Sequence, residues 1–331
     1  LFRSIADAAS SADDAQLNAD IPTAGDAAGV VNFSDSAGTT FTISSAKLES
    51  TASTNNIDLQ STNSIVINDL VTNVATSKTL TLNSPNSVKF QTGAGGFSMA
   101  TDNKIKLTAA GASLLIDAKA GTGTGNVTVG ALETKGSTGS ITLKGVTANL
   151  FGNLTTDGGK VDFSGSSKVS LNANVTIDTA STAATAGDVD FGNAALTAAA
   201  AGKRLTIDTS SNDNAGGTVS LGPVDNSGGS YVNQLTVKLF DTADTNSNQT
   251  AGKLKLTGDV RLDNDGAGTA AKFLVTGGVA DTTATSRRGQ VIVAPATGSS
   301  VTISTAQSAV TAGDVDLGTT QLTATTAGTD L

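Results

Sequence analysis

A three-residue unit of the form apolar–polar–apolar recurs along the chain from Phe41 onward. Examples are FTI (41–43), IDL (57–59), LTL (80–82), VTV (127–129), ITL (141–143), VDF (161–163 and 189–191), LTI (205–207) and VDL (315–317). Side chains of a strand alternate between its two faces, so each unit points two apolar residues inward and one residue outward. Clusters of Gly, Asn, Asp, Ser and Thr separate the units and favour turns. The pattern predicts many short strands.

The spacing of these units favours one architecture over its rival. A sandwich also gives strands every 8–12 residues, but some twenty short strands would need several sandwiches joined by linkers, and no linker is visible. A solenoid needs no linker because each coil packs only on its neighbours. We therefore expect an all-β fold, a parallel and right-handed β-helix (β-solenoid) over residues 41–331, with coils of roughly 20 residues.

An internal duplication supports the solenoid. VTIDTASTAATAGDVDFGNAALTAAAAG (175–202) aligns without gaps to VTISTAQSAVTAGDVDLGTTQLTATTAG (301–328), 126 residues further on. Duplication at this level indicates repeat architecture. The same offset carries Leu205, which opens LTIDT, onto Leu331, and from this we expect the natural polypeptide to continue.

Residues 1–40 lack the repeating unit and are predicted to be an N-terminal cap or lead-in. Within residues 1–20, Leu1, Ile5, Ala8 and Ala9 could form a weak apolar face of a helix. Ile21-Pro22 would then end it.

Composition narrows the function classes. The 331 residues include 37 Gly and no Cys, His or Trp, and the net charge is −9 with a pI of about 4.4. Disulfides and thiolate metal sites are excluded by the lack of cysteine. An acidic surface repels phosphate backbones, so we expect no nucleic-acid partner. No apolar run approaches the ~20 residues of a membrane helix, so we expect no membrane insertion of this segment.

Three stretches resemble a known group of proteins. GNVTVGALETKGSTGSITLKG (125–145), GGKVDFSGSSKVSLNANVTIDT (158–179) and AGDVDFGNAAL (186–196) with KRLTIDT (203–209) are similar to the repeats of filamentous-haemagglutinin-like adhesins and related β-strand-repeat or autotransporter-type bacterial exoproteins. The resemblance rests on pattern and composition over residues 41–331. It implies a long right-handed parallel β-helix at the cell surface.

Paired carboxylates are the first candidate chemistry. TAGDVDFG (185–192) contains Asp188 and Asp190, and TAGDVDLG (311–318) contains Asp314 and Asp316. Such pairs could act in acid–base cleavage of polysaccharides, or they could be the solvated outer face of a strand that occurs twice. The second interpretation is favoured, because a structural repeat copies everything whereas an enzyme seldom copies its catalytic pair. We therefore expect no enzyme activity and no catalytic residues.

Calcium is the second candidate, and we expect no other cofactor. DNDG (263–266) resembles the start of an oxygen-ligand loop, but the bidentate acid that should follow is missing, and an ordinary turn is favoured. The weak calcium candidates are Asp263, Asp265, Asp188, Asp190, Asp314 and Asp316.

GTGTGNVTVG (121–130) is interpreted as turn glycine rather than a phosphate cradle. The basic pairs Lys203/Arg204 and Arg287/Arg288 are interpreted as solvated turns.

These observations together predict a secreted structural or adhesive protein of the bacterial cell surface and outer membrane. The expected form is an elongated solenoid rod that stacks into a filament or continues into more repeats. Its expected partners are other copies, end to end or side by side, and a receptor or glycan on a host or neighbouring cell. The alternatives are a carbohydrate-active β-helix enzyme and a surface-layer lattice protein.

Overall fold

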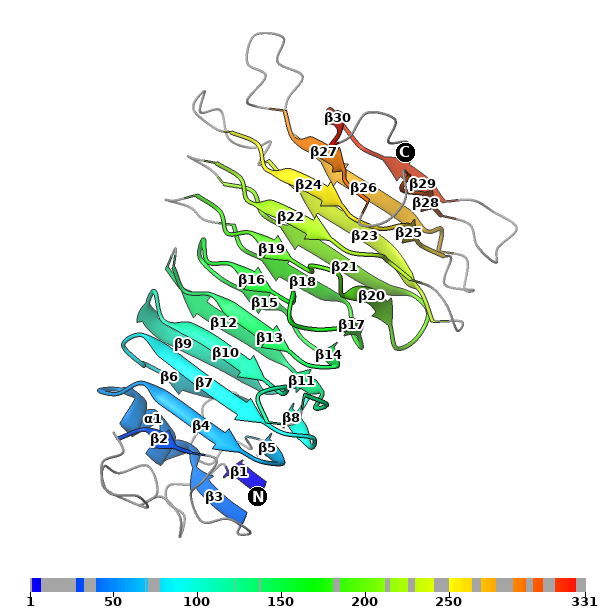
Figure 1. Cartoon of the computed structure of the whole chain (residues 1–331). Coiled ribbons are helices and arrows are strands. Elements are labelled where there is room, and N and C mark those ends of the chain that lie inside the picture. The colour runs from blue at the N-terminus through cyan, green and yellow to red at the C-terminus, as the bar shows by residue number, and fades with distance from the viewer. Residues whose placement is uncertain are drawn as a thin grey trace. The chain divides into compact units, whose positions relative to one another are not determined.

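A computed structural model gives the fold. It describes residues 2–6, 28–32, 40–68, 70, 78–121, 123–136, 138–180, 185–211, 215–225, 230–240, 250–263, 269–277, 288–295, 300–305 and 313–325. The chain divides into two compact units, Leu1–Gly152 and Asn153–Leu331, which are described separately. In both units the strand pairs run parallel and connect successive coils. The predicted fold class, a parallel β-helix of short strands, is confirmed (Figure 1).

The first unit contains three parallel sheets, here named A, B and C. Sheet A consists of β1 (Phe2–Ala6), β3 (Thr40–Ser44), β5 (Ser64–Ile67), β8 (Gly96–Met99), β11 (Val127–Val129) and β14 (Thr147–Leu150). Sheet B consists of β2 (Val30–Val31), β4 (Ile57–Ser61), β7 (Ser87–Thr92), β10 (Ser113–Asp117) and β13 (Ile141–Lys144). Sheet C consists of β6 (Thr79–Leu82), β9 (Lys104–Ala110) and β12 (Ala131–Lys135).

From β4 to the end of this unit the chain visits sheets B, A and C in strict rotation, so one coil has three strands. Register partners in sheet B, such as Ile57 with Val88 and Val88 with Leu114, are 26 to 31 residues apart. The expected coil of roughly 20 residues was therefore too short. The difference arises because each coil closes with three strands and three turns.

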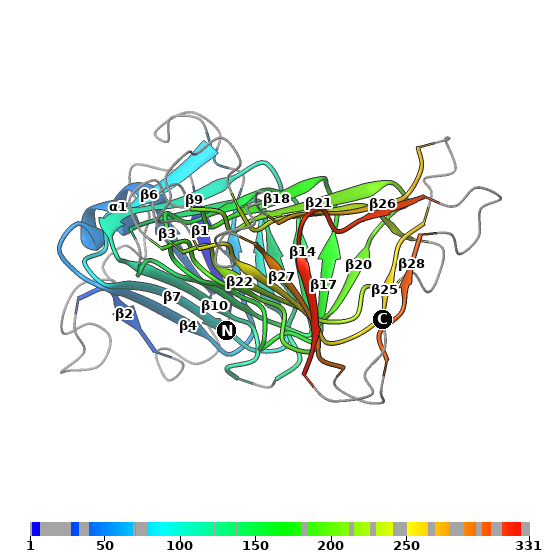
Figure 2. The ribbon, with the colours of Figure 1, turned by 90° about the horizontal axis from the view of Figure 1, so that it is seen from above.

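The second unit repeats this plan. Its sheet B consists of β16 (Val161–Asp162), β19 (Val189–Asp190), β22 (Thr218–Leu221), β24 (Lys253–Leu256), β27 (Gln290–Val293) and β30 (Gln321–Ala324). Its sheet C consists of β15 (Leu154–Thr155), β18 (Val175–Asp178), β21 (Lys203–Asp208), β23 (Val232–Lys238), β26 (Lys272–Thr276) and β29 (Asp314–Asp316). Its sheet A consists of β17 (Lys168–Leu171) with β20 (Ala195–Ala198), and β25 (Val260–Arg261) with β28 (Ile303–Ser304). Val224 bridges the two pairs. In Figure 2, β18, β21 and β26 of sheet C follow one another along the upper side of the view.

The core is the inside of the coils. Apolar residues at alternate strand positions are fully buried, as in β18, where Val175 and Ile177 point inward between outward Thr176 and Asp178. Register places like residues on top of one another, and the rings of Phe163 and Phe191 stack with centroids 5.0 Å apart. The predicted in–out–in pattern is confirmed. Stacked apolar columns therefore hold each coil on the next.

The N-terminal residues differ from the helical face expected over residues 1–20. Phe2–Ala6 is strand β1, which lies in sheet A between β3 and β5, with Ile5 buried. Pairing on both edges outweighs the weak helical pattern, and Ala8 and Ala9 lie outside the described residues. The helix comes later, as α1 (Ser45–Ala52), whose first turn is capped by the Ser44 hydroxyl accepting from the Lys47 N–H. Helix α1 buries Leu48 and packs against β3 and β6.

The duplicated segment occupies different sheets in its two copies. Val189 lies in sheet B (β19), whereas its counterpart Val315 lies in sheet C (β29). In sheet B the register runs from Val189 through Val219, Leu254 and Val291 to Leu322, with steps of 30 to 37 residues. An offset of 126 residues therefore falls one strand short of the sheet-B position.

Candidate functional site: outward carboxylates and a groove on sheet A

Lys160 joins two of the outward carboxylates across successive coils. Asp162 and Asp190 are register partners in sheet B. The Lys160 Nζ lies 3.2 Å from Asp162 and 3.1 Å from Asp190. Burial opposes charging of these groups, but Ser164 and Lys160 hold the pKa of Asp162 below its ordinary value, and the two carboxylates raise the pKa of Lys160. Asp190, one member of the predicted carboxylate pair, is thus part of an ion-pair row formed by Asp162, Lys160 and Asp190.

Asp188 is exposed and links its coil to the next. Its Oδ1 accepts the Thr218 N–H at 2.6 Å, 30 residues further along the chain. Asn126 and Asn174 accept backbone N–H groups of the following coil in the same way, from Thr147 and Arg204. Asp188 therefore satisfies a coil-to-coil backbone donor, as the short amides do at other corners.

Asp190 also closes a turn at the end of its strand. Its Oδ1 accepts the Gly192 N–H at 2.9 Å, and Asp316 accepts the Gly318 N–H at 2.8 Å. Both glycines have positive φ, +55° and +57°, which favours glycine. The same Asx turn therefore forms in both copies, although the copies lie on different sheets.

A threonine completes this corner, and its role was not predicted from the sequence. The buried Thr179 hydroxyl donates to the Gly187 carbonyl at 2.6 Å, and Thr305 donates to Gly313 at 3.0 Å. A Cβ on Gly187 would come within 1.9 Å of the Gly159 carbonyl oxygen of the preceding coil. The spacing Thr-x7-Gly, shared by both copies, is the signal that could have revealed the corner. TAGDVD(F/L)G is thus a corner motif of the solenoid.

A second carboxylate row lies on sheet C. Asp178, Asp208 and Lys238 are successive register partners, and Lys238 Nζ lies 3.2 Å from Asp208. Burial, together with the charge of Asp208, raises the pKa of Asp178, although the Ala180 N–H and Lys238 oppose it. The two aspartates therefore repel each other, and the lysine offsets only part of this repulsion.

The calcium candidates do not form one cluster. Asp188 and Asp190 make the contacts above, Asp314 and Asp316 lie in the exposed β29, and Asp263 is buried. Asp265 lies outside the described residues. Among the residues that the structure describes, no three His, Cys, Asp or Glu side chains gather as a metal site.

The basic pairs and the glycine-rich stretch also have places in the structure. Lys203 and Arg204 begin strand β21, so their interpretation as a turn was wrong. Pairing with β23 extends the strand to include them, since Lys203 and Arg204 are register partners of Val232 and Gln234. Arg287 lies outside the described residues. A Cβ on Gly125 would come within 2.4 Å of the Gly93 carbonyl oxygen, so this glycine permits close approach of coils.

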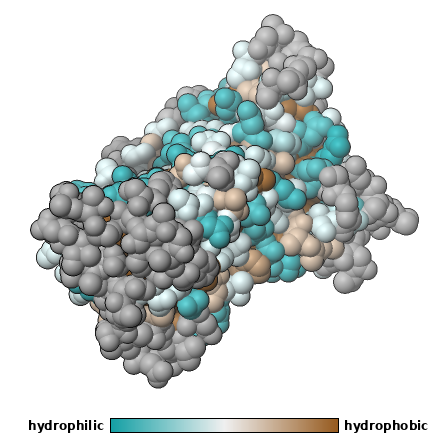
Figure 3. Space-filling view, turned by 60° about the horizontal axis from the view of Figure 1, so that its bottom comes forward, coloured by the Kyte–Doolittle hydropathy of each residue, from teal (hydrophilic) through white to brown (hydrophobic). Residues whose placement is uncertain are grey.

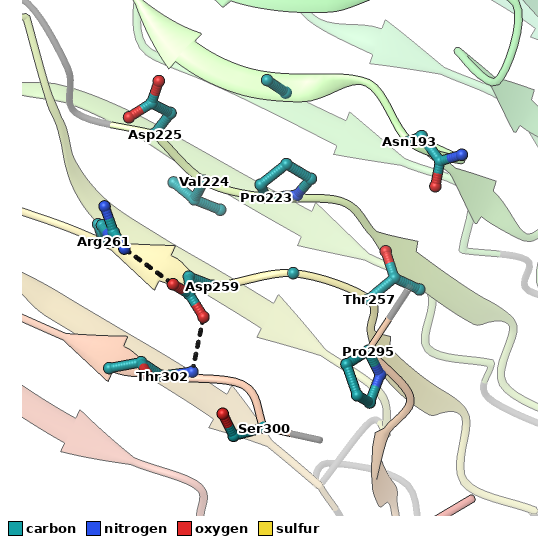
Figure 4. A pocket seen from close by; sticks show the side chains of 12 residues that line it. Asn193, Pro223, Val224, Asp225, Thr257, Asp259, Arg261, Pro295, Ser300 and Thr302 are labelled. Carbon is teal, nitrogen blue, oxygen red and sulfur yellow. Dashed lines mark hydrogen bonds and ion pairs between the residues drawn. The ribbon is translucent and has the colours of Figure 1, made fainter. Parts of the chain in front are cut away.

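A groove of about 820 Å³ lies on sheet A of the second unit (Figure 4). Four successive coils contribute to it. Its lining is Asn193, Ala195, Pro223, Val224, Asp225, Thr257, Gly258, Asp259, Arg261, Pro295, Ser300 and Thr302. Asp259 lies 2.9 Å from Arg261 Nη2, and its Oδ1 accepts the Thr302 N–H at 2.9 Å. The sequence did not predict this groove, because its residues are spread over 110 positions.

The fold defines the class of this chain as a parallel β-solenoid repeat protein. Comparisons with protein-family models, curated protein sequences and solved structures find no significant match. Within the described part of the chain, no helix has the length and apolar character needed to cross a membrane.

Proposed function

We propose that this chain belongs to a secreted structural and adhesive protein of the bacterial cell surface. The main support is the regular solenoid frame, which in most strands places a polar side chain outward between two inward apolar ones. On the face shown in Figure 3, hydrophilic and neutral residues predominate among those described. A frame of this kind presents an extended surface whose composition can vary without disturbing the core.

Self-association through strand edges is part of this proposal. Val315 and Leu322 are 47% and 51% exposed, yet their register partners Phe273 and Val291 are buried core residues. In the described part of the chain, β29 and β30 are the last strands of their sheets, and they present core-type side chains beside backbone edges that no described strand covers. Such edges are templates for further strand pairing. The proposed occupant of this edge is a coil of a second copy.

Two measurements test the proposal. Beads coated with the folded chain are expected to adhere to bacterial or epithelial cells, whereas beads coated with heat-unfolded chain are not. Sedimentation is expected to show assemblies that grow with concentration and that Leu322→Lys abolishes. Thr323→Lys, which adds the same charge to the adjacent position on the other face of β30, is the matched control. Absence of bead adhesion would refute the adhesive role, and equal effects of the two lysines would refute edge stacking.

A carbohydrate-active enzyme is the second candidate, favoured by the carboxylates and guanidinium in the groove. Asp259 is engaged by Arg261 and by a backbone N–H, an arrangement that supports a structural role. Release of reducing ends from a polysaccharide, lost in Asp225→Asn, would establish this candidate in place of a non-enzymatic protein.

A further inference from the structure

The groove on sheet A has a floor whose backbone groups are already paired. The Val224 N–H donates to the Asp259 carbonyl at 2.8 Å, and the Val260 N–H donates to the Thr302 carbonyl at 2.8 Å. The Asp225 N–H donates to the Leu196 carbonyl at 2.9 Å. An extended peptide that adds as a strand needs free backbone donors and acceptors. Recognition in this groove therefore depends on side chains.

The groove runs across the strands. Its lining comes from coils at Asn193, Val224, Asp259 and Thr302, whose backbones pair in succession. Four coils separated by the usual strand spacing extend over roughly 14 Å. An elongated ligand would lie along the direction in which the coils stack and meet groups from each of the four coils.

The side chains suit a ligand that has both hydroxyl groups and C–H faces. Asn193, Thr257 and Ser300 offer amide and hydroxyl groups (Figure 4). The Asp259–Arg261 pair holds an acceptor and a donor side by side in fixed positions. Pro223 and Pro295 add apolar surfaces. Ligand sites commonly combine such apolar surfaces with a few placed polar groups.

Charge decides between neutral and anionic ligands. Among the described lining residues are two carboxylates, Asp225 and Asp259, and one guanidinium, that of Arg261, which pairs with Asp259. The whole chain carries a net charge of −9. Phosphate, sulfate or uronate groups would be repelled. We propose that this groove binds a neutral oligosaccharide. The inference rests on the proposed adhesive function and names its receptor as a glycan.

The test uses immobilised neutral tetrasaccharides of glucose, galactose, mannose and N-acetylglucosamine, with a heparin tetrasaccharide as the anionic probe. The folded chain is expected to bind at least one neutral probe in preference to heparin. Ala195→Tyr places a ring in the groove from β20 and should weaken that binding more than tenfold. Thr197→Tyr, two residues further on the same face of the same strand but outside the groove, should leave it unchanged.

Asn193→Ala provides a second variant that removes an exposed amide without adding bulk, and it should weaken binding several-fold. Circular dichroism of each variant establishes that it is folded before binding is measured. Preference for heparin, absence of neutral binding, or equal binding by Ala195→Tyr and the parent chain would overturn the inference. If coated beads adhere to cells while no neutral probe binds, the groove inference fails and the adhesive function stands. If beads do not adhere, the adhesive function fails.

Discussion

Replacement of Lys160 by Met tests whether the outward carboxylates need the lysine between them. Methionine keeps an apolar stem of similar length but removes the charge that lies 3.2 Å from Asp162 and 3.1 Å from Asp190. Each partly exposed ion pair contributes about 0.2–1 kcal/mol. The variant also leaves two carboxylates directly opposite each other, which costs a similar amount. We expect a loss of about 1–2 kcal/mol at neutral pH, or roughly 1.5–3 °C in Tm for a chain of 331 residues.

The pH dependence of this loss follows from the pKa shifts. The pKa of Asp162 lies below its ordinary 3.8, so its stabilisation is present above that value and is lost as the pH falls through the folded pKa. The pKa of Lys160 lies above its ordinary 10.5, so its stabilisation is present below that value and is lost as the pH rises through the folded pKa. The effect of Lys160→Met is therefore full between these two values and shrinks outside them.

Urea unfolding followed by circular dichroism measures the loss at neutral pH and at a pH well below 3.8. Lys168→Met is the control, because Lys168 is exposed on β17 and no described carboxylate lies within ion-pair distance of it. A loss at neutral pH that persists in acid would show that the lysine stem, and not its charge, stabilises the coils. Equal losses for the two variants would refute the ion-pair row.

Substitutions at three further residues probe the corner motif and the carboxylate row on sheet C by the same unfolding assay. Thr179→Val leaves the Gly187 carbonyl without its buried donor and should cost about 1–3 kcal/mol, whereas Thr179→Ser should cost less; equal costs would contradict this role. Asp188→Ala should cost about 0.5–1.5 kcal/mol by leaving the Thr218 N–H unpaired, and Asp188→Asn, which keeps an acceptor, should not. Because the folded pKa of Asp178 is raised, its favourable contribution is present below 3.8 and is lost as the pH rises through the folded pKa. Asp178→Asn should therefore stabilise the chain by about 0.2–1 kcal/mol at neutral pH but not in strong acid, and a gain in acid would contradict the assignment.

The strands could be predicted from the sequence because their signal is local. Alternation within VTI (175–177) or VDF (189–191) is enough to orient each side chain, and the structure confirms both. The coil length could not be predicted in this way, since it depends on which distant strands pair. The insertion of β1 between β3 and β5 likewise has no local signal. Helix α1 has a local signal, the N-terminal cap at Ser44, but the helix is only eight residues long.

The roles of the carboxylates were predictable only in part. The outward position of Asp190 follows from alternation, but its contact with Lys160 requires knowledge that Val161 and Val189 are register partners. The groove could not be predicted from the sequence for the same reason. Asn193 and Thr302 become parts of one surface only through the successive pairing of four coils.

The two copies of TAGDVD(F/L)G show what a duplicated segment preserves in this solenoid. Its threonine–glycine hydrogen bond and its Asx turn recur in both copies, although one copy turns from sheet C into sheet B and the other from sheet A into sheet C. The motif therefore specifies a corner and leaves the choice of face to the lengths of the intervening coils. Because two different corners of the second unit carry it, the same turn serves more than one pair of faces while the inward positions Val189 and Phe191 stay in the core.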